Sequence, residues 1–313
     1  MDRWDRVGRA AAYGAALALT PYLLIKVSWV VGSLLGLLPV GTGFGKAEWV
    51  VLNSATIGMA GTGIAVALAL VRPWGMRIPG TPLAFCAWVG TGFLVPVLPY
   101  AVLSSLLGSA DGDVESGNDA GPSMPAWEAA LVQIGFVGMG LGLAIALPTY
   151  LRRRWPDAFA GRLGDGGEGS TRMLPWMAVV GAVVGLVWLY WAVGGTAGVA
   201  HRGERDLAWH VLSGVFGTWA FVASTATWAV VRGRPARVPR WGPMVLGWLG
   251  SGSLFAWSGW KLPFTLYLAV AQPANAALPE NLALAAVLHL AAVGAGAAML
   301  RALVRTRLVS ADS

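Results

Sequence analysis

Two lysines lie deep inside apolar stretches of the sequence, where a charged side chain is costly. Lys26 lies 16 residues after Ala10 and 14 residues before Val40, and Lys261 lies 18 residues after Pro243 in another apolar stretch. A charge at the centre of a bilayer costs ~2.5–3.5 kcal/mol on insertion scales, and such residues usually face a helix-bundle interior or a wet cavity. The two lysines therefore predict a polar site inside a membrane protein.

Anion binding is the chemistry expected at this site, because no acidic residue is positioned to neutralise Lys26. The apolar stretches have no Asp or Glu near their middle, and the nearest acids, Glu48 and Glu128, lie at the ends of theirs. A buried ammonium without an acidic partner loses its proton, reaches a carboxylate through water or holds an anion. We therefore predict an anionic ligand beside Lys26, either a lipid phosphate or a small carboxylate.

Polar side chains on other apolar stretches extend the predicted site. His289 lies about eight residues into its stretch, which places it ~12 Å along a helix from that end. The expected ligand-binding residues are Lys26, Gln133, Lys261 and His289. A second polar set near the outer ends of the stretches is expected to line an outward-facing cavity, and it consists of Glu48, Asn53, Glu128 and His210.

Structural roles compete with these functional assignments. In the structural interpretation, Lys26 bonds to helix-end carbonyls or to Glu128. Lys261 then extends past Pro263 to the outer membrane interface, as long basic side chains near helix ends do. Glu48 and Glu128 lie at the same interface, and the two histidines hydrogen-bond to neighbouring helices. The sequence alone leaves both interpretations open.

Motifs for metals, nucleotides and covalent catalysis are missing from the sequence. Cys86 is the only cysteine, so neither a disulfide within the chain nor a cysteine zinc cluster is possible. The string Gly41–Lys46 lacks the Walker spacing and the Ser or Thr after the lysine, and there is no HExxH motif. The sequence therefore predicts no metal, no cofactor and no catalytic residues.

Membrane-spanning helices are the elements expected to position the polar residues. The 313 residues are 56% hydrophobic and 12% charged, with a mean hydropathy of +0.63, whereas soluble domains carry about 25% charged residues. Stretches long enough to cross ~30 Å of hydrocarbon cover residues 10–40, 48–71, 81–107, 127–151, 174–200, 207–231, 243–271 and 281–300. We predict an all-α, polytopic integral membrane bundle with eight transmembrane helices in a lipid bilayer.

The basic residues predict how these helices are oriented. Seventeen of the 19 arginines lie before the first stretch or in every second connection after it, and the other side has only Lys46, Arg202 and Arg205. Since basic loops stay on the cytoplasmic side, both termini are expected in the cytoplasm, with the protein in the cell membrane. The net charge of +7 is then a result of topology, and we expect no nucleic-acid partner.

A repeated motif divides the chain into two halves. Arg77–Pro79 is followed by Trp88 in W-V-G-T-G-F-L, and Arg237–Pro239 is followed at the same spacing by Trp248 in W-L-G-S-G-S-L. Gly32 similarly matches Gly194, and Gly36 matches Gly198. We therefore predict two tandem parallel four-helix repeats, 1–160 and 161–313, related by an axis along the membrane normal. Three GxxxG pairs are expected to be helix-packing faces, and they are Gly32 with Gly36, Gly181 with Gly185 and Gly194 with Gly198.

The segment Leu189–Thr196, with the letters LYWAVGGT, resembles a YWALGG-type helix found in multi-span membrane proteins of actinobacteria. The resemblance covers about one helix and implies membrane insertion without implying an activity. Three functions remain open at this level. The chain binds or transports a small anionic ligand or lipid, or it is a non-catalytic sensor or scaffold for a partner membrane protein, or it is a membrane-embedded enzyme acting on lipid. We favour the first, because buried polar groups within repeats are typical of transporters.

Overall fold

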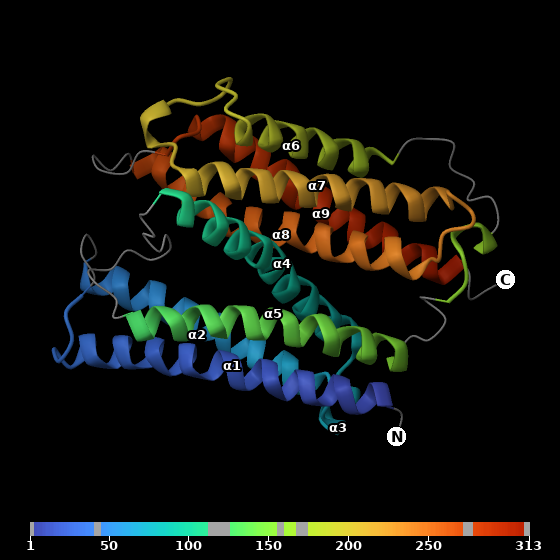
Figure 1. Ribbon diagram of the computed structural model, residues 1–313, viewed down its shortest axis with the longest axis horizontal. Coiled ribbons are helices and arrows are strands. Elements are labelled where there is room, and N and C mark those ends of the chain that lie inside the picture. The colour runs from blue at the N-terminus through green and yellow to red at the C-terminus, as the bar shows by residue number, and fades with distance from the viewer. Residues whose placement is uncertain are drawn as a thin grey trace. The chain divides into compact units, whose positions relative to one another are not determined.

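Long α-helices account for nearly all of the described structure, as the apolar stretches predict. The computed structural model describes residues 3–40, 45–111, 126–154, 160–166, 175–271 and 278–309. These residues contain nine α-helices (Figure 1). Contacts divide the chain into two compact units, one of Met1–Ala87 with Gly112–Arg154 and one of Trp88–Asp111 with Trp155–Ser313, and each is described by itself.

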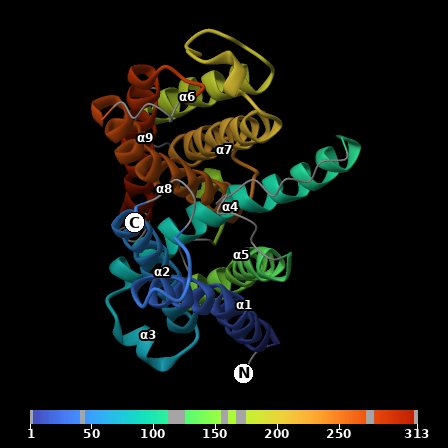
Figure 2. The same ribbon diagram turned by 90° about the vertical axis from the view of Figure 1, so that its left-hand side faces the viewer.

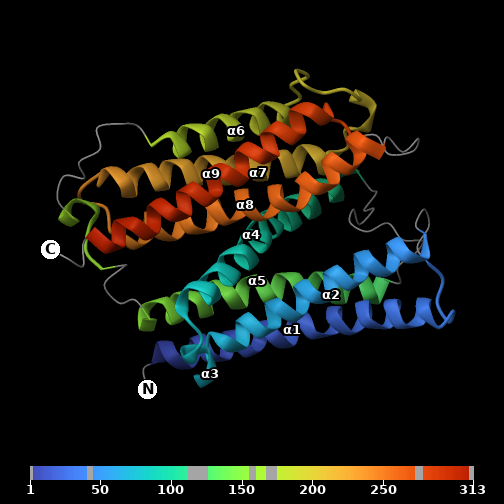
Figure 3. The ribbon, with the colours of Figure 1, turned by 180° about the vertical axis from the view of Figure 1, so that it is seen from behind.

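The first unit is built around its first helix. It contains α1 (Arg3–Leu34), α2 (Lys46–Ala69), the short α3 (Pro73–Arg77), α5 (Ala126–Arg154) and the first residues of α4 (Gly80–Asp111). α1 packs against both α2 and α5, and Figure 3 shows the three helices side by side. Gly138 and Gly142 of α5 lie against Ala18 and Ala15 of α1. Small residues four positions apart let the two backbones approach closely.

The second unit contains a four-helix bundle. Its members are α6 (Trp176–Ala192), α7 (Leu207–Arg232), α8 (Trp241–Ala271) and α9 (Leu282–Val309). Each helix packs against the next in the chain, and α9 also packs against α6, which closes the ring (Figure 2). Large side chains such as Trp188 and Phe216 pack together in the bundle, with Leu254 and Leu288. Contacts of this kind hold each side chain in one place.

The two copies of the repeated motif contact each other within the second unit, where α4 crosses α8. Trp88 is fully buried, and its Nε1 donates hydrogen bonds of 3.1 Å to the Trp248 carbonyl oxygen and to Ser251 Oγ. Gly92 lies directly against the backbone of Gly252, so a side chain at either position would meet main-chain atoms. The glycines of the motif therefore allow the two helices to cross at close range.

Two helices end earlier than predicted, at glycines in left-handed conformations. α1 ends at Leu34 rather than Val40, and α6 ends at Ala192 rather than Ala200. Gly36 has φ +72° and Gly194 has φ +94°, and the amide of the following residue bonds back to the carbonyl four positions before each glycine, at 2.8 Å in both cases. This pattern is a Schellman motif, which terminates a helix.

These conformations also correct two of the predicted packing faces. Gly36 and Gly198 have positive φ outside a helix and Gly194 ends one, so the pairs 32/36 and 194/198 do not form faces. Gly181 and Gly185 do: Gly181 lies against Ser224 and Gly185 against Ala220, both on α7. Gly32 and Gly194 are also not equivalent positions, since only the first lies within a helix.

Eight of the nine described helices coincide with the eight predicted stretches. Six are long and apolar enough to cross a membrane, and their spanning segments are Asp5–Leu34, Lys46–Ala69, Gly80–Leu103, Ala130–Leu151, Leu207–Arg232 and Leu282–Arg305. α6 has only 17 residues, and α8, with 31 residues, carries many Gly, Ser and Trp residues. A multi-pass membrane protein is therefore supported, and the eight spans and the tandem repeats remain predictions. The compact units also differ from the predicted 160/161 division at α4.

Candidate functional site

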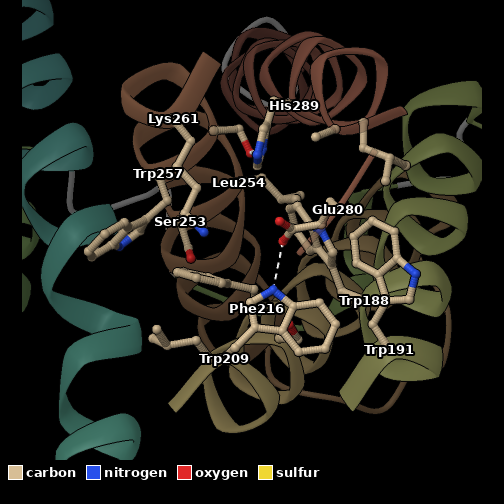
Figure 4. Close-up of a pocket in the computed structure, with 15 residues that line it drawn as sticks. Trp188, Trp191, Trp209, Phe216, Ser253, Leu254, Trp257, Lys261, Glu280 and His289 are labelled. Atoms are coloured by element: carbon tan, nitrogen blue, oxygen red, sulfur yellow. Dashed lines mark hydrogen bonds between the residues drawn. The ribbon is translucent and has the colours of Figure 1, made fainter. Parts of the chain in front are cut away.

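A cavity lies in the α6–α9 bundle, at the end where α6 stops and α7 begins (Figure 4). Its volume is about 40 Å³, measured as the space open to the centre of a water-sized sphere. At 10–15 Å³ per water on this measure, it holds about three waters. The lining residues are Trp188, Trp191, Trp209, Leu212, Ser213, Phe216, Ser253, Leu254, Trp257, Ser258, Lys261, Glu280, Ala285, Leu288 and His289.

Aromatic rings form much of the cavity wall. The Phe216 ring lies between two tryptophans, with centroids 6.0 Å from Trp188 and 5.4 Å from Trp257. Trp191 and Trp209 continue the wall, with their centroids 6.1 Å apart. Ring faces carry partial negative charge and attract cations within about 6 Å. The wall is therefore apolar, yet it attracts positively charged groups.

Glu280 is held in place by both its side chain and its surroundings. Trp209 Nε1 donates a 2.8 Å hydrogen bond to Glu280 Oε1. The residues on either side are tied to the loop after α6, because the Pro279 carbonyl accepts from the amide of Ala200 at 2.8 Å and the Asn281 amide donates to the Gly198 carbonyl at 2.9 Å. The carboxylate is therefore fixed in one position at the cavity.

Lys261 supplies the opposite charge. Its ammonium lies 5.4 Å from the centre of the Phe216 ring. Within the described part of the chain, this ammonium makes no hydrogen bond, and no carboxylate lies within 4.0 Å of it. Figure 4 shows Lys261, Glu280 and His289 directed toward the same central space. An ammonium and a carboxylate thus share one cavity without touching.

His289 and Ser258 form a second polar pair. His289 Nδ1 lies 3.3 Å from Ser258 Oγ, and the two residues are 9% and 1% exposed. A serine hydroxyl beside an imidazole is the arrangement used to activate a nucleophile. Across the described residues, no carboxylate hydrogen-bonds to His289, so nothing orients the imidazole as the acid of a catalytic triad does.

The first turns of α7 and α9, which lie next to the cavity, are capped by side chains of Asp206 and Asn281. Asp206 Oδ1 accepts a 2.7 Å hydrogen bond from the Trp209 amide, which fixes the first turn of α7 and so places the Trp209 ring. Asn281 Oδ1 accepts from the amides of Ala283 and Leu284 at the start of α9. Asp and Asn are strongly preferred at this position because they satisfy free backbone donors.

Two of the four predicted ligand-binding residues meet in this cavity, Lys261 and His289. The other two, Lys26 and Gln133, belong to the first unit. Lys26 is 3% exposed, and its ammonium lies 4.2 Å from the Trp29 ring centre and 5.7 Å from that of Tyr22. Gln133 is exposed on α5.

The four residues predicted to line an outward-facing cavity do not lie together. Glu48 is exposed and caps α2, accepting a 3.0 Å hydrogen bond from the Gly45 amide. Asn53 is buried, and its Nδ2 donates to the Trp49 carbonyl at 2.8 Å. Glu128 is partly buried in the first turn of α5. His210, in the second unit, contacts the Ala192 carbonyl at 3.2 Å. None of these four residues lines the cavity.

Sequence reasoning missed Glu280, three serines and the aromatic wall. A usable signal was present on α8, since Ser253, Ser258 and Lys261 recur at helical spacing on one face, together with Leu254 and Trp257. No spacing rule could bring Glu280 to this place, because it lies in a connection rather than on a helix.

Metal binding finds no support in the described ranges, which contain no group of three His, Cys, Asp or Glu side chains able to hold an ion. Comparisons of the chain with protein-family models, with curated proteins and with solved structures give no match. The function is therefore inferred from the geometry of the cavity.

Proposed function

We propose that this chain is a multi-pass membrane protein that binds a small ligand carrying an anionic group in the cavity of the α6–α9 bundle. Lys261 is the residue that carries the proposal. Its ammonium lines the cavity, and in the described structure it makes no hydrogen bond and has no carboxylate within 4.0 Å. A charge removed from bulk water is stable only with compensating groups. An anionic ligand provides that compensation.

The membrane arrangement in this proposal extends the six supported spans to eight. α6 is ~26 Å long at 1.5 Å per residue, close to the hydrocarbon thickness, and α8 is enclosed by α7 and α9. Eight spans place seventeen arginines on one side, which makes that side cytoplasmic together with both termini. The cavity then opens toward the outside of the cell membrane.

Internal duplication belongs to the same proposal. Gly92 and Gly252 occupy the same position in the two motif copies, and they meet where α4 crosses α8. Two copies related by a two-fold axis bring equivalent residues together at that axis, so this contact supports the repeat. The cavity is asymmetric, since Lys261 of the second copy corresponds to Ala101 of the first.

Acetate titration of the purified protein tests the proposal. Four tryptophans line the cavity, so intrinsic fluorescence reports its occupation. We expect a saturable change on adding acetate at constant ionic strength. Replacing Lys261 by methionine keeps the length of the side chain and removes its charge, so we expect affinity to fall at least tenfold.

The matched control is Lys46→Met, because Lys46 is an exposed lysine at the start of α2. It is expected to bind acetate as wild type does. Co-purified phosphatidylglycerol is measured in parallel, and its loss in Lys261→Met alone would assign the anionic group to lipid. An acetate response that survives Lys261→Met, with lipid content unchanged, would contradict the proposal.

Hydrolysis of an acyl substrate is a second candidate, favoured only by the 3.3 Å contact of Ser258 with His289. In that reaction Ser258 Oγ bonds to the acyl carbon, the bond from that carbon to the leaving group breaks, and the serine proton passes through His289 to the leaving group. Water then attacks the acyl carbon and gives a proton to His289, which returns it to Ser258 Oγ as the carboxylic acid leaves. We then expect a fluorophosphonate probe to label the wild-type protein and not Ser258→Ala, as read by intact-protein mass. Absence of labelling in the wild type would dismiss this candidate.

A further inference from the structure

The cavity is lined by a carboxylate, Glu280, as well as by the Lys261 ammonium. These two opposite charges limit the class of ligand that fits. We infer that the ligand is a small free zwitterion, whose carboxylate is bound by Lys261 and whose ammonium is bound by Glu280. The inference rests on the proposed function, because it takes the anionic group at Lys261 as given. It adds a positive group to the ligand beside the negative one, and it sets an upper limit on the size of the ligand.

The separation of the two charges is the first argument. Lys261 and Glu280 both line the cavity, yet no ion pair joins them within 4.0 Å. Oppositely charged groups that leave bulk water gain most when they make direct, well-oriented contacts. Glu280 is held away by the Trp209 hydrogen bond and by the anchored residues beside it. A molecule with one charge of each sign completes both contacts at once.

Each pole is surrounded by groups that suit the charge it would bind. Around Lys261, the hydroxyls of Ser253 and Ser258 lie on the same face of α8 and can donate to a carboxylate. Near Glu280, the rings of Trp191 and Trp209 line the cavity, and aromatic rings attract an ammonium through their faces. A simple anion would bind to Lys261 but would be repelled by Glu280. A simple cation would bind to Glu280 but would be repelled by Lys261.

Cavity size excludes large ligands. The volume of about 40 Å³ corresponds to about three waters, which together occupy ~90 Å³ of liquid. Glycine, with five heavy atoms, has this scale and carries its ammonium and its carboxylate on a single methylene carbon. A lipid headgroup with its glycerol and chains is too large. We therefore take glycine as the probe for the class of small amino-acid zwitterions.

Three probes separate the two poles. Acetate is glycine without its ammonium, and methylammonium is glycine without its carboxylate. We expect calorimetric or fluorescence titration of the full chain in detergent to show that glycine binds at least tenfold more tightly than either fragment. A glycine affinity no higher than that of acetate would overturn the zwitterion, while Lys261-dependent acetate binding would leave the proposed function standing.

Two variants assign the poles. Lys261→Met is expected to weaken glycine and acetate at least tenfold and to leave methylammonium unaffected or tighter. Glu280→Gln, which keeps the shape and the acceptor for Trp209, is expected to weaken glycine and methylammonium tenfold and to leave acetate unaffected or tighter. The control is Glu204→Gln, an exposed carboxylate on the turn Arg202–Glu204, for which no change is expected.

The remaining outcomes are also decisive. If Glu280→Gln binds glycine as wild type does, the carboxylate is not part of the site and the inference is wrong. If no probe binds and only Lys261-dependent lipid is found, the zwitterion is excluded and the anionic group is lipid. If neither probe nor lipid depends on Lys261, the proposed function fails as well. Thermal unfolding of each variant shows whether a lost response reflects lost folding, and Glu280→Gln remains a test if Lys261→Met does not fold.

Discussion

The substitution Gly92→Leu is expected to lower the thermal unfolding midpoint of the protein by several degrees. Gly92 of α4 lies against Gly252 of α8, and a Cβ atom at Gly92 would come 2.9 Å from the Ser253 amide nitrogen and closer still to the Gly252 carbonyl. Backbone atoms cannot move aside as a side chain can. Overpacking of this kind costs ~1–3 kcal/mol or more, because the helices must separate to relieve it.

The same motif provides the control. Gly90 lies two residues earlier in α4, and a Cβ there would have nothing within 4 Å. Gly90→Leu is therefore expected to unfold within about a degree of wild type in the same detergent. Equal unfolding midpoints for Gly92→Leu and Gly90→Leu would mean that the close crossing of α4 and α8 does not contribute to stability.

Cysteines at the two ends of α7 are expected to react from opposite sides of the membrane. Gly203 is exposed in the turn before α7, and Ala236 is exposed in the connection after it. With Cys86 replaced by serine, Gly203→Cys should react fully in intact cells with a membrane-impermeant maleimide. Ala236→Cys should react only after permeabilisation, since four arginines surround it on the side expected to be cytoplasmic.

Mass shifts of the labelled protein give the readout, and Cys86→Ser without a new cysteine gives the background. Labelling of both positions from outside would mean that α7 does not cross the membrane. Labelling of Ala236→Cys alone from outside would reverse the orientation and move the cavity to the cytoplasmic side.

Helix positions were predictable from the sequence because the bilayer imposes one solution on long apolar segments. The ends of the helices were less predictable. The GxxxG spacing predicts packing faces at Gly36 and Gly194, whereas both glycines terminate helices. A glycine four residues from another is compatible with a helix face and with a Schellman end, and only the residues that follow decide between them. After Gly36 the sequence offers Pro39 as such a signal, since proline is common shortly after a helix end.

The candidate site was predictable in part. Lys261 and His289 were identified as the polar exceptions in apolar helices, and they line one cavity. Glu280 was not identified, since a glutamate in a connection is ordinary until the chain folds. Its position depends on contacts with the loop after α6, which join residues about 80 positions apart. Long-range pairing of irregular segments leaves no periodic signal for sequence reasoning to use.

The polar face of α8 has a consequence for the biosynthesis of the protein. This helix does not reach the hydropathy of the six spanning helices, because glycine, serine and a lysine replace aliphatic residues where it meets α4 and lines the cavity. A segment of marginal hydropathy gains little free energy by moving from the translocon into the lipid by itself. α4 and α7 are synthesised earlier and already present small-residue faces when α8 emerges. In the proposed eight-span arrangement, membrane insertion of α8 is thus coupled to its assembly with these helices. The residues that make the site polar then also make the bundle depend on the order in which its helices are synthesised.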